Sequence, residues 1–124
     1  MQLVSAGTRR TTTTPSGTMT TLASPTQGGA THPLWLVAMR PGAEGPLHAF
    51  EAEVVWSLTE GGGSVWVGGR EERLTAGDTV VLAPGELRQF VAGAEGFRAV
   101  VTTVAPGRVT RGDGSDPLVP EWVA

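Results

Sequence analysis

His48 and Arg88 are the two residues of this sequence whose types, taken together, could do chemistry. A neutral imidazole serves as a general base near pH 7, and a guanidinium stabilises a developing enolate or carboxylate. If the two side chains lie close together, the positive charge of Arg88 lowers the pKa of His48 and keeps its imidazole neutral. Such a pair would suit proton transfer next to a carbonyl, as in isomerisation, epimerisation, cyclisation or elimination.

The composition of the chain excludes many other chemistries. Its 124 residues include no cysteine and no tyrosine, and all nine basic residues are arginine. The sequence therefore offers no thiolate for a metal or a nucleophile and no lysine for a Schiff base. Its two histidines cannot make a three-histidine metal site within one chain. The net charge of −3 argues against general nucleic-acid binding.

Short strands must position these residues, because 18 glycines and 9 prolines interrupt every longer segment. No segment shows a long apolar period of 3.6 residues, and the stretches between the breaks are rich in Val, Thr, Trp and Leu. Many short strands separated by turns predict an all-β sandwich or barrel. The predicted strands cover residues 19–23, 33–39, 47–50, 53–58, 64–67, 71–74, 79–82, 88–91 and 97–104.

Three glycine-containing breaks are predicted to be turns. We expect residues 60–63 to close a hairpin and Gly68-Gly69 to close a second, tighter one. Residues 76–78 lead into the apolar run 79–82, which predicts a mostly buried strand.

The two ends of the chain differ in composition from its centre. No apolar run reaches the roughly 18 to 20 residues of a membrane helix, and no apolar stretch typical of a signal peptide is found near the N-terminus. We therefore expect a cytoplasmic protein with one barrel domain over residues 17–105. Residues 1–16 are expected to form a tail or an edge strand, and residues 106–124 an irregular segment anchored by Trp122.

Two stretches resemble the motifs of the cupin family. The first is PGAEGPLHAFEAEVVWSLTEGGGSVWVGG, in which Gly42, His48 and Gly61 keep the spacing of the family pattern G-x5-H-x-H-x3-E-x6-G. The second is AGDTVVLAPGELRQFVAG, which is similar to G-x5-P-x-G-x2-H-x3-N through Gly77 and Gly85. The resemblance covers residues 35–104 and is to small single-domain bacterial cupins of the actinobacterial type.

The resemblance implies a double-stranded β-helix jelly roll, often a homodimer. Its metal would be held by two histidines and a glutamate from the first motif and a histidine from the second. Only His48 keeps a ligand type here, because the other three positions hold Phe50, Val54 and Arg88. An arginine offers no lone pair and repels a cation. We therefore expect no metal and no other cofactor at this site.

His48 and Arg88 each have a second interpretation. His48 is either a satisfied core histidine or a group that contacts a ligand, whereas His32 is expected to be an exposed loop residue. An inward Arg88 needs a partner, because an unpaired buried guanidinium is costly. The partner is an anionic ligand or an internal carboxylate, or else the strand slips and Arg88 lies on the surface. The candidate carboxylates are Glu44, Glu51, Glu53 and Glu86.

An aromatic pocket is expected beside the catalytic pair His48 and Arg88, although the same residues could form an ordinary core. Trp66 is expected on the outer face, where an exposed aromatic side chain would indicate a dimer interface. The predicted pocket residues are Phe50, Val54, Trp56, Trp35, Met39 and Phe90.

Three functions follow from these observations, because a fold alone does not decide function. The first is a metal-free pocket for a small aromatic or anionic organic molecule, either as a binding module or as an isomerase or cyclase. The second is a metal-dependent oxygenase or isomerase with a rearranged site. The third is a structural protein with a filled barrel. The expected partners are a small organic ligand and a second copy of the chain, with no nucleic acid and no membrane.

Overall fold

The computed structural model describes all 124 residues, and its regular secondary structure is almost entirely β-strand, which confirms the all-β prediction. No helix in it is long and apolar enough to cross a membrane. Its elements are a 3-10 helix η1 (Ala6–Thr8) and the strands β1 (Arg10–Thr13), β2 (Gly17–Ala23), β3 (Leu34–Met39), β4 (Ala49–Phe50), β5 (Val54–Val67), β6 (Arg70–Thr75), β7 (Thr79–Leu82), β8 (Arg88–Thr103) and β9 (Val109–Thr110).

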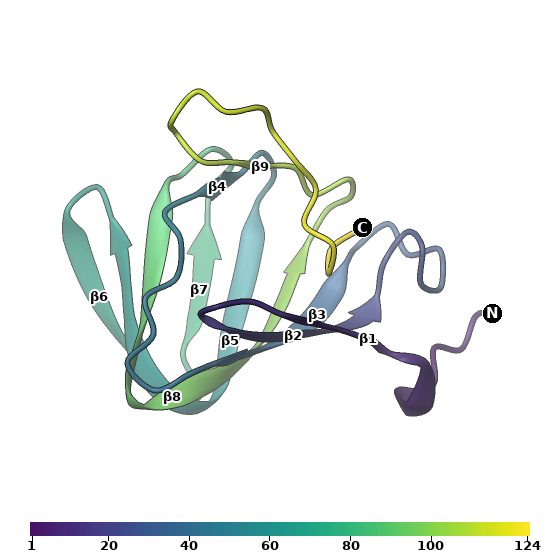
Figure 1. Cartoon of the computed structure of the whole chain (residues 1–124), viewed down its shortest axis with the longest axis horizontal. Helices are drawn as coiled ribbons and strands as arrows, with labels where there is room; N and C mark the ends of the chain where they lie inside the picture. The colour runs from purple at the N-terminus through teal and green to yellow at the C-terminus, as the bar shows by residue number, and fades with distance from the viewer.

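One antiparallel sheet contains seven of the strands, in the order β1-β2-β3-β8-β5-β6, with β7 paired to β5. In Figure 1, β5, β7 and β8 stand side by side while β1, β2 and β3 turn across them, so that the sheet encloses an interior. Strand β1 pairs only with β2, so the threonine-rich segment is an edge strand and not a tail. The short strands β4 and β9 form a separate two-stranded sheet.

Alternation along the strands separates the interior from the solvent. On β3, the buried residues Trp35, Val37 and Met39 alternate with half-buried ones, as a period of two requires. The inward side chains join in one cluster of 18 buried hydrophobic residues. Trp66 lies on the opposite side of its strand and is 40% exposed, which agrees with its expected place on the outer face.

The glycine run at residues 60–63 does not close a hairpin, so that prediction was wrong. Strand β5 continues through it from Val54 to Val67, with register shifts against β8 on either side of Gly61. A Cβ atom at Gly61 would collide with the carbonyl oxygen of Gly96, and one at Gly63 with that of Val91. The glycines therefore let β5 and β8 approach closely where both bend. Strand β8 likewise continues through the bend, so the two predicted strands 88–91 and 97–104 are one strand.

The two other predicted turns are present, at Gly68-Gly69 between β5 and β6 and at residues 76–78 before β7. The expected burial of β7 was wrong, because only Leu82 is buried and Val81 is 61% exposed. Thr79 and Val81 are exposed, whereas Val80 is half-buried and Leu82 is buried, so one face of β7 meets solvent.

The C-terminal segment packs onto the barrel. Figure 1 shows it, in yellow, passing over the upright strands and then descending beside them. Its β9 pairs with β4, and Val123 is fully buried. The hydroxyl of Thr21 donates a hydrogen bond of 2.7 Å to the carbonyl oxygen of Trp122. The segment is therefore held at both ends and forms one wall of the interior.

Candidate functional site

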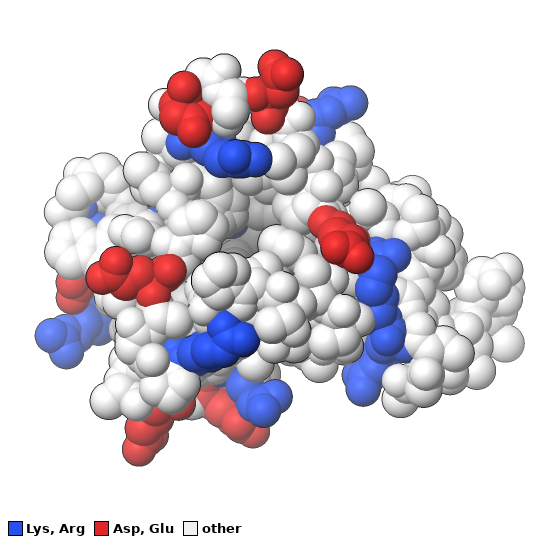
Figure 2. Space-filling view, viewed as in Figure 1, with Lys and Arg blue, Asp and Glu red and all other residues white.

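An apolar cavity of about 680 Å³ opens inside the barrel. Five of the six predicted pocket residues line it, namely Trp35, Met39, Phe50, Trp56 and Phe90. The sixth, Val54, is absent from the lining and belongs to the packed core, where it is 1% exposed. Figure 2 shows that this face of the molecule is hollowed near its centre and that the surface around the hollow is mostly uncharged. A barrel with a cavity of this size is not a filled one.

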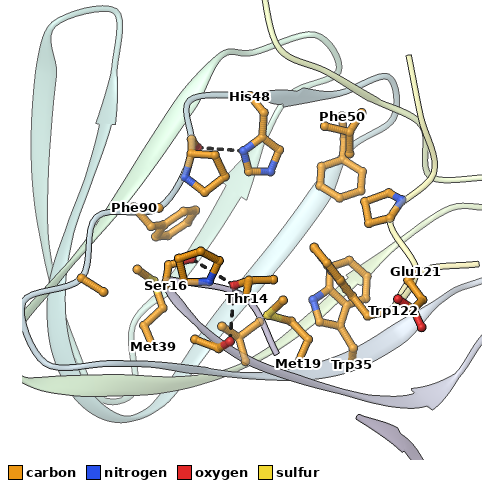
Figure 3. A pocket seen from close by; sticks show the side chains of 18 of the residues that line it. Thr14, Ser16, Met19, Trp35, Met39, His48, Phe50, Phe90, Glu121 and Trp122 are labelled. Carbon is orange, nitrogen blue, oxygen red and sulfur yellow. Dashed lines mark hydrogen bonds between the residues drawn. The ribbon is translucent and has the colours of Figure 1, made fainter. Parts of the chain in front are cut away.

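Stacked aromatic rings form much of the cavity wall. Trp56 and Phe90 stack with ring centroids 4.1 Å apart, and Trp35 and Phe50 with centroids 6.2 Å apart. Figure 3 shows Phe90 and Phe50 on opposite sides of the cavity, with Trp35 and Met19 along its lower border. Such walls suit the face of a flat organic ring.

His48 lies just before β4 and points its imidazole into the cavity (Figure 3). Its Nδ1 lies 2.8 Å from the carbonyl oxygen of Pro46. A carbonyl oxygen only accepts hydrogen bonds, so Nδ1 carries the hydrogen and Nε2 keeps a free lone pair. The pKa of His48 is lowered to about 4, first by burial and then by the charge of Arg88, while the Pro46 hydrogen bond acts in the opposite direction. The imidazole is therefore neutral at pH 7.

Arg88, the first residue of β8, lies behind His48 and Phe50 and outside the cavity lining. Its Nη1 donates a hydrogen bond of 2.9 Å to the carbonyl oxygen of His48. Its Cζ lies 4.9 Å from the centroid of the Phe50 ring, within the range of a cation–π interaction. Burial lowers the pKa of Arg88 to about 10, which leaves the guanidinium charged at neutral pH.

The structure supports none of the three alternatives for Arg88. The surface alternative was wrong, because the residue is 1% exposed. No salt bridge includes Arg88, so it has no internal carboxylate partner. Glu51 is bound to Arg108 at 3.8 Å, and Glu86 accepts a hydrogen bond of 2.8 Å from the backbone of Ala83. Contact with an anion in the cavity is closed to Arg88 in this arrangement, because it does not line the wall.

Apart from His48, the polar side chains that line the cavity gather at its mouth. Thr14 and Ser16 come from the turn between β1 and β2, Glu44 from the loop before β4, and Arg111 and Glu121 from the C-terminal segment. The three charged residues are exposed and form no salt bridge. Two carboxylates and one guanidinium give the mouth no preference for an anionic ligand.

The sequence prediction omitted several residues that line the cavity. Met19 and Val37 were assigned only to strands, and residues 118–122 were assigned only to an irregular segment. The signal for the second group is a run of apolar residues, Leu118 to Pro120, followed by Trp122, in a stretch that is otherwise rich in Gly, Asp and Pro. His32 lies outside the lining and is exposed, as expected.

The residues at the family's metal-ligand positions do not fit a metal ion. These positions hold one imidazole, two hydrocarbon side chains and a guanidinium, in His48, Phe50, Val54 and Arg88. A transition-metal site needs three or more converging donors. No group of three His, Cys, Asp or Glu side chains comes together anywhere in the chain. The buried charge of Arg88 beside His48 would also repel a cation.

Solved structures with the same fold come from several enzymes. The polyketide cyclase RemF from Streptomyces resistomycificus superposes with a TM-score of 0.77 at 21% identity, over 94% of this chain and 88% of its own. Salicylate 1,2-dioxygenase from Pseudoaminobacter salicylatoxidans gives a TM-score of 0.72 at 22% identity, over 86% of this chain and 31% of its own. Oxalate decarboxylase from Bacillus subtilis gives 0.78 at 14% identity, over 90% of this chain and 32% of its own.

These similarities establish the fold, since the identities are too low to transfer an activity. The chain spans about a third of the length of the dioxygenase and the decarboxylase. No curated protein matches the sequence. The sequence does match the family model of the cupin domain over residues 35–110, which is more than half of the chain. The protein is therefore a member of the cupin family, with the jelly-roll barrel that its two motifs predicted.

Proposed function

We propose that this cupin binds a small neutral aromatic molecule through a hydroxyl group, whose hydrogen bond is accepted by Nε2 of His48. The observation that carries the proposal is the 2.8 Å contact between Nδ1 of His48 and the carbonyl oxygen of Pro46. It leaves Nε2 as the ring nitrogen with a free lone pair, on a side chain that lines the cavity. A pKa of about 4 keeps that lone pair available throughout the neutral pH range.

The cavity supports an aromatic ligand by its size and its walls. Its volume of about 680 Å³ lies within the range of small-molecule sites. Trp35, Phe50, Trp56 and Phe90 offer ring faces or edges for stacking. A few polar groups in such a wall fix the orientation of the ligand. His48, just before β4, points its imidazole into the cavity (Figure 3).

The ligand that we propose is neutral, although the sequence alone favoured an anionic one. That expectation depended on Arg88 reaching the ligand, and Arg88 does not line the cavity. Glu44 and Glu121 at the mouth disfavour an anion, and Arg111 offsets only one of them.

Turnover, where it occurs, would be a metal-free isomerisation or cyclisation. Nε2 of His48 would take a proton from one atom of the substrate, and the imidazolium would return it to another, so that no co-reactant is consumed. A base with a pKa of about 4 removes only acidic protons, such as those between two carbonyl groups. The similarity to a polyketide cyclase of nearly equal length supports this class of reaction.

Binding of 2-naphthol, followed by quenching of tryptophan fluorescence, tests the proposal because Trp35 and Trp56 line the cavity. The matched probe is 2-methoxynaphthalene, which has the same rings but no hydrogen to donate. We expect 2-naphthol to bind about tenfold more tightly, since an unpaired buried acceptor costs about 1–3 kcal/mol.

The variant His48→Phe keeps a ring at this position and removes the acceptor, so it should abolish the preference for 2-naphthol. The control is His32→Phe, which changes the chain's other histidine in an exposed loop and should leave the preference intact. Equal affinity of the unmodified protein for both probes would contradict the proposal.

A further inference from the structure

We propose that Arg88 is a positioning residue, which holds His48 and Phe50 in the orientation in which both side chains face the cavity. The inference extends the proposed function, because it assigns to Arg88 the support of the acceptor on His48. Arg88 acts through these two residues and does not itself touch the ligand.

Arg88 makes all the hydrogen bonds of the His48 backbone, at the end of the segment that leads into β4. Strand β4 is two residues long. Residues 40–48 bond to β8 through Gly42 and Gly45 and through two isolated bridges, Glu44 with Val91 and His48 with Arg88. At the second bridge the backbones of His48 and Arg88 exchange hydrogen bonds of 3.1 and 2.9 Å. Nη1 of Arg88 then adds a bond of 2.9 Å to the same carbonyl oxygen of His48. Arg88 thus donates both hydrogen bonds that the carbonyl oxygen of His48 accepts, and its own carbonyl oxygen accepts the bond from the His48 amide.

The guanidinium of Arg88 also supports the aromatic wall. Its Cζ lies 4.9 Å from the centroid of the Phe50 ring. That ring in turn lies 5.9 Å from the imidazole of His48 and 6.2 Å from the Trp35 ring. A shift of Arg88 would therefore move the acceptor and the neighbouring wall together.

A contribution to stability does not explain why an arginine is buried at position 88. The residue is 1% exposed, and its Nε and Nη2 have no hydrogen-bond partner. No carboxylate compensates its charge. An apolar side chain of similar length would fill this space without burying an uncompensated charge. Residues that break the packing rules in this way are expected at functional sites.

The first experiment compares Arg88→Met with the unmodified protein by NMR of the His48 ring nitrogens and by 2-naphthol binding. In the variant we expect the pKa of His48 to rise above about 4 but stay below 6.5, because its burial remains. We also expect the tautomer with hydrogen on Nδ1 to lose population, and 2-naphthol to bind about tenfold more weakly. The other charged groups near the cavity, Glu44, Arg111 and Glu121, are unchanged in the variant.

The control variant is Arg98→Met, which removes an exposed arginine from the same strand and should leave the His48 signals and the 2-naphthol affinity unchanged. If Arg88→Met does not fold, Arg88→Lys replaces it, because lysine keeps the charge but loses the planar fork. For Arg88→Lys we expect a smaller loss of the Nδ1 tautomer and several-fold weaker binding.

Unchanged His48 signals in a folded Arg88 variant would overturn the positioning role. Failure of the proposed function gives a different result, in which the unmodified protein shows no preference for 2-naphthol. In that case the pKa and the tautomer of His48 still decide the role of Arg88, because both are measured without a ligand.

Discussion

Two buried regions of this barrel differ in the chemistry of their side chains. The core around Val54, Leu58 and Val101 contains hydrocarbon side chains that are 1% exposed or less. The second region, made by His48, Phe50 and Arg88, buries a guanidinium with two unpartnered N–H groups beside an imidazole of lowered pKa. We call this second region the polar corner.

The difference separates what specifies the fold from what forms the site. Close packing of hydrocarbon side chains lowers the free energy of the folded state and selects one arrangement. Burial of an uncompensated charge raises that free energy, so the polar corner is expected to persist for its function. Phe50 belongs to both regions, because it is part of the hydrophobic cluster and also lies under Arg88. Substitutions in the two regions should therefore differ in what they change.

The largest effect is expected from Leu58→Ala in the core. Leu58 is 1% exposed, and truncation of a buried leucine costs about 2–5 kcal/mol of unfolding free energy through lost contacts and a new void. Urea denaturation measures this loss. The folded variant should still prefer 2-naphthol to 2-methoxynaphthalene, because Leu58 does not line the cavity.

The control for that variant is Val81→Ala, since Val81 is 61% exposed on β7 and its truncation should cost less than about 0.5 kcal/mol. A Leu58→Ala loss as small as that of the control would mean that the core does not dominate stability, and the comparison of the two regions would fail.

The second effect is a dependence of stability on pH that comes from His48. The ordinary pKa of a histidine, which we take for the unfolded chain, is 6.5, and the pKa of His48 in the folded protein is about 4. Between these two pH values the unfolded chain therefore binds more protons than the folded protein. The contribution of His48 to stability is therefore complete above about pH 6.5 and is lost as the pH falls toward 4. A shift of this size corresponds to at most about 3 kcal/mol. Urea denaturation at a series of pH values measures it.

His48→Phe should flatten this pH dependence between about pH 5 and 7, where most carboxylates are already ionised. The control His32→Phe should retain the slope of the unmodified protein. If His48→Phe retains the slope as well, the imidazole is not held neutral by the polar corner.

Much of the fold is predictable from the sequence, because glycine and proline mark where strands end. The same signal misleads at residues 60–63, where glycine permits close approach of two strands and not a reversal of the chain. Local sequence does not separate the two cases, since the partner strand, β8, lies about 30 residues further along. Strand β7 shows a related limit, because its run of apolar residues does not reveal that one of its faces meets solvent.

The site is predictable to the extent that alternation along a strand decides which side chains face inward. Phe50, Trp56 and Phe90 were predicted to face the pocket, and all three line the cavity. Alternation does not tell how deep a residue lies below the cavity wall. Val54 and Arg88 both point inward, but neither lines the cavity. Depth depends on what covers a residue, and for Arg88 that is the ring of Phe50, from another strand.

The smallest change in stability is expected when either of two arginines of β8, Arg88 or Arg98, is replaced by methionine. Arg98 pairs with Glu60 at 3.4 Å, and both side chains are largely exposed, so Arg98→Met should cost less than about 0.5 kcal/mol and lose even that at high salt. Arg88→Met removes one hydrogen bond and the contact with Phe50, but it also removes a buried charge with two unpartnered N–H groups. We expect it to leave stability unchanged or to raise it by up to about 2 kcal/mol while 2-naphthol binding weakens. Urea denaturation of both variants at low and high salt measures these differences. A large loss of stability in Arg88→Met would show that the polar corner holds the fold together as the core does, and the distinction between the two regions would then disappear.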